Sequence, residues 1–213
     1  MPSERVPDLS LFVDILRTLE AIGAPYMIIG AFAGTVYGVT RVTYDIDIVV
    51  DLCETHIQAM AAAYPSSRYY ADPMQMRDSI RLGIMFNIID SSRGEKADLV
   101  PLTMASRYRE AFQRRVRQMV EMPGAEPFEV WCARPEDVIV GKLMAWIEGR
   151  SRKHETDIFE MMVFYYLGAD PALSDAFDQA YVDAQARVLG ADAYALWEAI
   201  KDAAQREANR TDD

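Results

Sequence analysis

The feature that most constrains the fold is a change of hydrophobic pattern near residue 133. Before this point, short apolar runs typical of strands alternate with amphipathic segments typical of helices; after it, apolar residues recur at helical spacing. The pattern predicts an α+β protein, with a small mixed β-sheet flanked by helices in residues 1–133. Residues 134–213 are expected to form a helical C-terminal region that packs on this core.

The expected elements follow from periodicity and from turn residues such as Gly23, Gly38 and the pair Pro123-Gly124. In the core we expect helices at residues 9–22, 31–37 and 54–64, and strands at 26–30, 44–50, 82–89, 97–100, 115–121 and 128–132. Beyond the core we expect helices at residues 135–146, 156–167, 171–189 and 191–208.

Composition excludes several classes of protein. The chain is 51% hydrophobic, which is globular rather than disordered, and its formal net charge of −11 argues against indiscriminate binding to nucleic acid or anionic membrane. The longest uncharged stretch, residues 26–40, is too short for a membrane span, and the N-terminus lacks signal-peptide order, so we expect a cytoplasmic protein. Cys53 and Cys132 are predicted to be buried and unpaired.

Two acidic residues interrupt an apolar strand. Asp45 and Asp47 flank Ile46, and residues two apart on a strand share a face. Two carboxylates held together repel each other unless a cation compensates them, and Mg²⁺ prefers such oxygen ligands. With Asp98 on a later strand, three acids can hold two metal ions; alternatively, the pair lies at a strand end and faces water.

A glycine turn precedes the acid pair. Gly30 follows an apolar strand and opens a short helix, an arrangement that presents backbone N–H groups to a phosphate.

Taken together, these motifs resemble the polymerase-β-like nucleotidyltransferase superfamily, and within it the AbiEii-like (MenT-like) nucleotidyltransferases, many of which are toxins of toxin–antitoxin pairs. The resemblance spans roughly residues 8–166 and rests on residues 28–33, Tyr37-Gly38, Arg41, Thr43, Asp45-Ile46-Asp47, Arg134-Pro135-Glu136-Asp137, Ile139, Lys142-Leu143, Arg152-Lys153 and Asp157.

This resemblance implies a nucleotidyltransferase fold and the Mg²⁺- or Mn²⁺-dependent transfer of an NMP from an NTP to an acceptor hydroxyl. Asp45 and Asp47 would bind the metals and the triphosphate, and Asp98 would be a metal ligand or the base. The implied nucleotide-binding residues are Gly30 and Ala31 through the backbone, Arg41 bracing the acids or meeting phosphate, Lys142 as a point charge, and Asp157 supporting it.

The chain departs from the family pattern at two places. Ala31 stands where the family has Gly or Ser and offers no hydroxyl to phosphate, and His154 or Glu155 stands where an Asp is common. The departures are compatible with a different substrate, weakened catalysis or a non-catalytic relative. His154 is expected on a helix surface rather than as a ligand.

The acceptor and the partners stay open at this level. The acceptor is tRNA, a protein side chain or a small molecule, and two basic segments, 107–117 and 150–153, either border the cleft for RNA or solvate outer surfaces. Tyrosines 64, 69 and 70 either stack on a base or pack locally. Two other functions compete with catalysis: a nucleotide-sensing or partner-binding protein, and a helical module at residues 134–210 for a cognate antitoxin or an oligomer.

Overall fold

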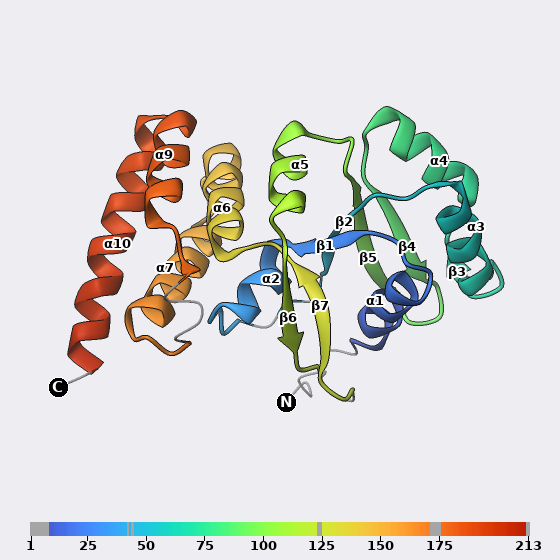
Figure 1. Ribbon diagram of the computed structural model, residues 1–213, viewed down its shortest axis with the longest axis horizontal. Coiled ribbons are helices and arrows are strands. Elements are labelled where there is room, and N and C mark those ends of the chain that lie inside the picture. Colours follow the sequence, from blue (N-terminus) through green and yellow to red (C-terminus); the bar gives the residue numbers. More distant parts are fainter. Residues whose placement is uncertain (1–8, 42, 44, 123–124, 171–175, 212–213) are drawn as a thin grey trace. The chain divides into compact units, whose positions relative to one another are not determined.

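The computed structural model describes residues 9–211 except 42, 44, 123–124 and 171–175 (Figure 1). The described residues form two compact units. Unit 1 comprises those within 1–32 and 42–133, and unit 2 those within 33–41 and 134–213. Residues 33–41 therefore group with the C-terminal helices, not with the α/β core in which the sequence analysis placed them.

Unit 1 contains a mixed sheet, which confirms the expected fold class. Among the described residues its strand order is β3–β4–β5–β2–β1–β7–β6. The β1/β7 and β2/β5 pairs are parallel, and the other neighbours are antiparallel. The strands are β1 (Tyr26–Ile29), β2 (Asp47–Val50), β3 (Tyr69–Tyr70), β4 (Phe86–Asp90), β5 (Glu95–Pro101), β6 (Val116–Val120) and β7 (Phe128–Cys132).

The central strands are buried because their residues are almost all apolar. Met27, Ile28, Ile48, Val49 and Leu99 are completely inaccessible to solvent.

The helices of this part are α1 (Ser10–Ala21), α2 (Gly30–Val36, which begins in unit 1 and ends in unit 2), α3 (Glu54–Ala63), α4 (Pro73–Leu82) and α5 (Ser106–Gln113).

Unit 2 is helical, as its spacing of apolar residues predicts. Among its described residues, α10 packs against α7 and α9, and α6 packs against α7 and α9. Residues 33–41 join this bundle at Gly38, whose φ is +94° and which lies so close to Phe164 that no side chain fits there. The helices are α6 (Pro135–Gly149), α7 (Arg152–Tyr166), α9 (Gln179–Leu189) and α10 (Ala191–Thr211).

Several sequence-based expectations differ from the structure. The predicted strand at 82–89 is wrong at its start, because Leu82 ends α4 and Gly83, with φ +66°, terminates that helix before β4. Helices α4 and α5 and strand β3 were not predicted. Cys132 is buried as expected, but Cys53 is exposed at the N-cap of α3. The expected Pro123-Gly124 turn lies outside the described residues.

Within the part of the chain that the structure describes, no helix combines the length and the apolar character needed to span a bilayer.

Candidate active site

Two of the predicted acids lie side by side in unit 1. Asp47 is the first residue of β2, where it pairs with Ile29 of β1 on one side and Asp98 of β5 on the other. Because β2 and β5 run parallel and these two residues are directly aligned, their side chains project from the same face of the sheet. The Asp98 N–H donates to the Ile46 carbonyl at 3.0 Å, which fixes this register.

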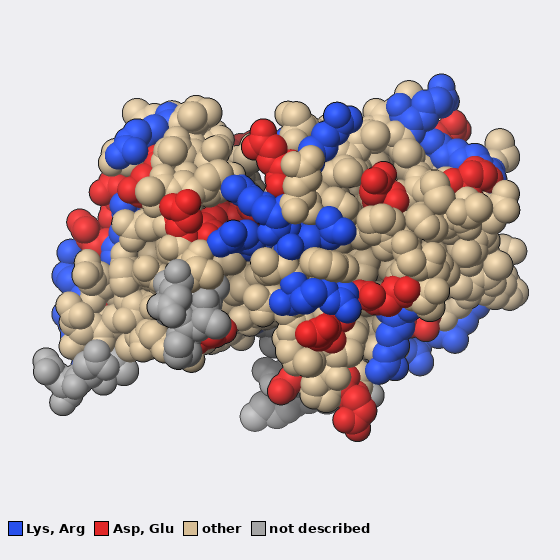
Figure 2. Space-filling view, viewed as in Figure 1, with Lys and Arg blue, Asp and Glu red and all other residues tan. Residues whose placement is uncertain are grey.

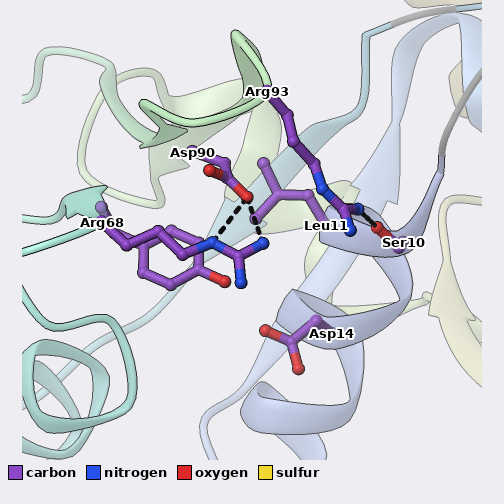
Figure 3. A pocket seen from close by; sticks show the side chains of 7 residues that line it. Ser10, Leu11, Asp14, Arg68, Asp90 and Arg93 are labelled. Atoms are coloured by element: carbon purple, nitrogen blue, oxygen red, sulfur yellow. Dashed lines mark hydrogen bonds and ion pairs between the residues drawn. The ribbon is translucent and has the colours of Figure 1, made fainter.

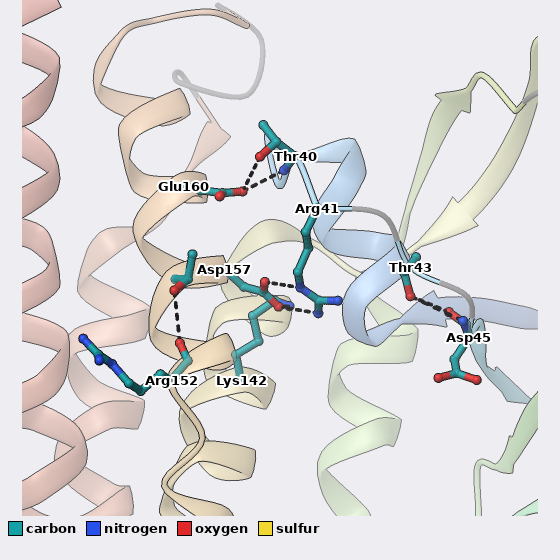
Figure 4. A network of polar contacts seen from close by, with 9 residues as sticks. Thr40, Arg41, Thr43, Asp45, Lys142, Arg152, Asp157 and Glu160 are labelled. Atoms are coloured by element: carbon teal, nitrogen blue, oxygen red, sulfur yellow. Dashed lines mark hydrogen bonds and ion pairs between the residues drawn. The ribbon is translucent and has the colours of Figure 1, made fainter. Parts of the chain in front are cut away.

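Asp45 does not share the strand with Asp47, which corrects the expected strand at 44–50. The ladder between β1 and β2 stops at Ile29 because Gly30 already begins α2, so β1 offers no partner beyond that point. Instead, the Thr43 hydroxyl donates to the Asp45 carbonyl at 3.0 Å (Figure 4). The Asp45 side chain is 63% exposed, so it remains accessible at the end of the strand.

The predicted glycine turn is present at Gly30. Its φ is +68°, a left-handed conformation that favours glycine, and a Cβ there would lie 3.2 Å from Cγ of Asp47 and overlap its Oδ2. The Asp47 carboxylate therefore occupies the space that a side chain at residue 30 would fill. Ala31 follows in α2 and is half-buried.

Two neighbours of Asp98 were missed by sequence reasoning. The Asp98 residue is 8% exposed, and its Oδ1 accepts a hydrogen bond from the Asn87 side-chain amide, which lies directly opposite on β4. The Lys96 ammonium lies 3.2 and 3.1 Å from Oδ1 and Oδ2 of Asp98 and 3.9 Å from Oδ1 of Asp45. Its position two residues before Asp98 on the same strand was the signal available in the sequence.

The pKa of Lys96 is raised by this environment. The hydrogen bond to Asp98 is the main cause, partial burial opposes it, and the negative charges of Asp98, Asp45 and Asp47 add to the increase. Lys96 is therefore a cation at neutral pH.

The carboxylates fit a divalent metal ion in their chemistry. Within the described residues, no three His, Cys, Asp or Glu side chains converge as a metal-ligating group. Asp47 and Asp98 nevertheless provide aligned carboxylate oxygens, the ligands that Mg²⁺ and Mn²⁺ prefer, and Gly30 leaves room for the Asp47 carboxylate. A metal ion would be held by this pair, and the exposed Asp45 is available to join them.

The remaining predicted residues form a buried ion cluster in unit 2. The Arg41 guanidinium donates to both oxygens of Asp157, at 2.6 and 2.8 Å, and Nζ of Lys142 donates to Oδ2 at 2.6 Å (Figure 4). Asp157 is 0% exposed and Lys142 is 5% exposed. Burial alone would raise the pKa of Asp157, but the hydrogen bonds from Arg41 and Lys142 outweigh it and lower that pKa.

The surroundings of this cluster are closely packed. A Cβ added at Gly34 would lie only 3.0 Å from Cγ2 of Val39, as well as 3.4 Å from Nζ of Lys142, so glycine is favoured there. Glu160 accepts hydrogen bonds from the backbone N–H of Thr40 at 2.7 Å and from its hydroxyl at 3.1 Å. His154 lies in the first turn of α7 and is half-buried, and burial followed by the charge of Lys153 lowers its pKa.

Two arginines of the first basic segment, residues 107–117, contact other residues of unit 1. Arg115 stacks over the rings of Phe112 and Trp131, at 4.1 and 4.7 Å from their centroids. Arg117 forms ion pairs with Glu20 and Glu129, and Figure 2 shows basic and acidic atoms next to one another over β6 and β7. These two arginines stabilise the β6–β7 hairpin, whereas Arg107 and Arg109 lie on α5.

Two of the three candidate base-stacking tyrosines pack locally, whereas Tyr70 is 46% exposed. Tyr64 is 2% exposed, and its ring meets the edge of Tyr69 with centroids 5.2 Å apart. Tyr69 also lines a pocket of about 220 Å³, together with Ser10, Leu11, Asp14, Arg68, Asp90 and Arg93 (Figure 3). There the Arg68 guanidinium binds the buried Asp90 carboxylate at 2.6 Å, which links the residue before β3 to the end of β4. None of the predicted site residues lines this pocket.

Comparison with known proteins gives a family match. Residues 30–212 match the model of the family described as nucleotidyl transferase AbiEii toxin, type IV toxin–antitoxin system. No curated protein is significantly similar to the chain.

The solved structures to which the chain is similar share little sequence with it. An antigenic nucleotidyltransferase-like protein from Paracoccidioides brasiliensis is 18% identical, with 72% of this chain and 75% of that chain covered and a TM-score of 0.47. The antibiotic-resistance factor ANT(2'')-Ia is 20% identical, with 83% and 94% covered and a TM-score of 0.45. A putative nucleotidyltransferase from H. pylori is 13% identical, with 95% of each chain covered and a TM-score of 0.40.

Proposed function

Because this chain belongs to the family of AbiEii nucleotidyl transferase toxins, we propose that it transfers an NMP from an NTP to an acceptor hydroxyl in a metal-dependent reaction. The observation that supports this most directly is the alignment of Asp47 with Asp98 on adjacent parallel strands, beside the Gly30 turn. Two adjacent carboxylates, of which Asp98 is buried and Asp47 half-buried, are costly to hold together unless a cation compensates them, and a turn of this kind presents N–H groups to phosphate.

In the proposed reaction, the acceptor hydroxyl oxygen forms a bond to the α-phosphorus while the bond to the bridging oxygen of the β-phosphate breaks. Pyrophosphate leaves, and the hydroxyl proton passes to Asp98 or to solvent. Asp98 acts either as a metal ligand or as this base, and Asn87 holds its carboxylate in place. A bound metal ion would supply Lewis-acid activation of the phosphate and neutralise charge.

The nucleotide-binding assignments of Gly30, Ala31, Arg41, Lys142 and Asp157 stay predictions. Gly30 and Ala31 would contribute backbone N–H groups, and Lys142 and Arg41 would contribute positive charge. Asp157 would position both cations, since it bonds to each of them in unit 2.

The proposed partners follow from the family. A cognate antitoxin is expected for a member of a type IV toxin–antitoxin family. The acceptor is proposed to be tRNA, a protein or a small molecule, and oligomerisation and a cytoplasmic location stay predictions.

A label-transfer assay tests the proposal. The protein is incubated with Mg²⁺ or Mn²⁺, each of the four α-³²P NTPs and cell extract, and labelled products are separated before and after nuclease or protease treatment. We expect the wild type to transfer label and the isosteric variants Asp47→Asn and Asp98→Asn to lose it by at least about 100-fold. Asp51→Asn is the matched control, because Asp51 follows the other end of β2 and is exposed.

One observation favours a second function. Ala31 offers no hydroxyl to phosphate, which suits a relative that binds nucleotide without turning it over. Saturable NTP binding with no label transfer under any of these conditions would support a nucleotide-sensing or partner-binding protein and refute the catalytic proposal.

A further inference from the structure

A lysine ammonium lies among the carboxylates proposed to bind metal. Lys96 and Asp98 are two residues apart on β5 and therefore share a face of the strand, and Nζ lies 3.1 Å from Oδ2 of Asp98. The same Nζ lies 3.9 Å from Oδ1 of Asp45. A single flexible cation thus contacts acids from two segments of the chain.

The two side chains of this ion pair differ in how far they can move. The Asp98 side chain is 11% exposed and is also held by Asn87, whereas the Lys96 side chain is 48% exposed. The carboxylate is therefore fixed while the ammonium is free to move into water. Such a cation neutralises the acids but can be displaced from them.

The next step rests on the proposed function and concerns the same site. We propose that Lys96 is an internal counter-ion, which stabilises the acids of the metal-free protein and is displaced from Asp98 when a divalent ion binds. The ammonium and the metal ion compete for the same carboxylate oxygens. Lys96 therefore lowers the affinity of the free protein for metal.

A purely structural ion pair predicts the opposite change in metal affinity when Lys96 is removed. If Lys96 only oriented Asp98 for metal binding, then removing it would misplace the carboxylate and weaken metal affinity. If it is a competing counter-ion, then its removal leaves the acids repelling each other and strengthens metal affinity. The direction of the change in affinity therefore decides between the two roles.

The experiment is titration of the full-length protein with Mn²⁺ alone, without nucleotide, followed by isothermal calorimetry and by the EPR signal of free Mn²⁺. The test variant is Lys96→Met, which keeps the length of the side chain and removes its charge. Lys96→Arg retains the charge, and Arg81→Gln is the matched control that removes one exposed positive charge elsewhere in unit 1.

We expect Lys96→Met to bind Mn²⁺ about tenfold more tightly than the wild type, because a charge at this range shifts a carboxylate equilibrium by about 10- to 1,000-fold and exposure favours the lower value. Lys96→Arg and Arg81→Gln should remain within about twofold of the wild type. The metal-free Lys96→Met protein should melt at a lower temperature, and Mn²⁺ should raise its Tm more than that of the wild type.

Unchanged or weaker Mn²⁺ binding by Lys96→Met would overturn the counter-ion role. Lys96→Gln serves as a second neutral variant, so that a folding defect particular to methionine does not decide the result. If Asp47→Asn abolishes Mn²⁺ binding while the Lys96 variants leave it unchanged, then only this inference fails. If neither the wild type nor Lys96→Met binds Mn²⁺, then both the inference and the proposed metal dependence are refuted.

Discussion

The buried carboxylate of Asp157 gives a sharp prediction about stability. Replacing it with Asn keeps the shape of the side chain but leaves the ammonium of Lys142, which is 5% exposed, without its acidic partner. Breaking a buried ion pair on one side costs about 3–5 kcal/mol, because the remaining charge stays buried. The Arg41 side chain is 36% exposed and can turn toward water, so its lost pair adds only about 0–1 kcal/mol.

This cost should be visible in thermal melts. The total cost is about 3–6 kcal/mol, and for a protein of this size each kcal/mol corresponds to about 2–4 °C, so Asp157→Asn should lower Tm by about 6–24 °C at pH 7. Glu160→Gln is the matched control on the same helix and should cost less than about 1 kcal/mol. The double variant Asp157→Asn/Lys142→Met should recover part of the loss, since it removes the orphaned charge.

The pH dependence follows from the direction of the shift. Because the pKa of Asp157 is lowered in the folded protein, its stabilising contribution is complete above the unfolded pKa of about 3.9 and is lost as pH falls through the folded value. The Tm difference between wild type and Asp157→Asn should therefore be constant near neutrality and shrink in strong acid. A difference below about 2 °C at pH 7, or a double variant no more stable than the single one, would refute this reasoning.

Two substitutions and one thiol-reactivity measurement test other parts of the structure. Gly30→Ala should destabilise unit 1 and weaken Mn²⁺ binding, because its Cβ would overlap the Asp47 carboxylate; unchanged melting and binding would contradict the described turn. Native protein should react with one equivalent of Ellman's reagent at Cys53, whose pKa is lowered chiefly by a hydrogen bond with Thr55, while Cys132 should react only in denaturant. Leu143→Ala, at a completely buried position of α6, should cost about 2–5 kcal/mol in urea unfolding; a loss below about 1 kcal/mol would indicate a site that collapses freely.

The parts of the fold that the sequence predicts are those in which burial repeats with a clear period. Strand β1 is a short apolar run that ends at a glycine, and the buried residues of α1 recur every three or four positions. In contrast, α4 and α5 bury only two residues each, Met76 and Ser79 in one and Ala111 and Phe112 in the other. A helix with so few buried residues has no apolar stripe that its sequence would reveal. The N-cap and the C-terminal glycine of α4 were nevertheless available signals.

The same distinction applies to the candidate site. Asp47 and Asp98 stand out because carboxylates are unusual in apolar strands, and the ion cluster around Asp157 was suggested by family resemblance. Asn87 was missed because its position opposite Asp98 depends on the strand register, which spacing along the chain does not specify. Lys96 lies two residues before Asp98 on the same strand, so its spacing was visible in the sequence and was overlooked. The start of β2 at Asp47 was also missed, since it depends on where β1 ends.

The chain crosses between the two units three times, and this has a consequence for synthesis on the ribosome. The segment 33–41 emerges between β1 and β2, yet its partners Asp157, Glu160 and Phe164 are made more than a hundred residues later. A nascent chain that has reached residue 133 therefore contains all the described strands of the sheet but still lacks the partner of Arg41. Formation of these distant contacts must wait for α7, so the first unit to be translated carries an unfinished loop until the second has emerged.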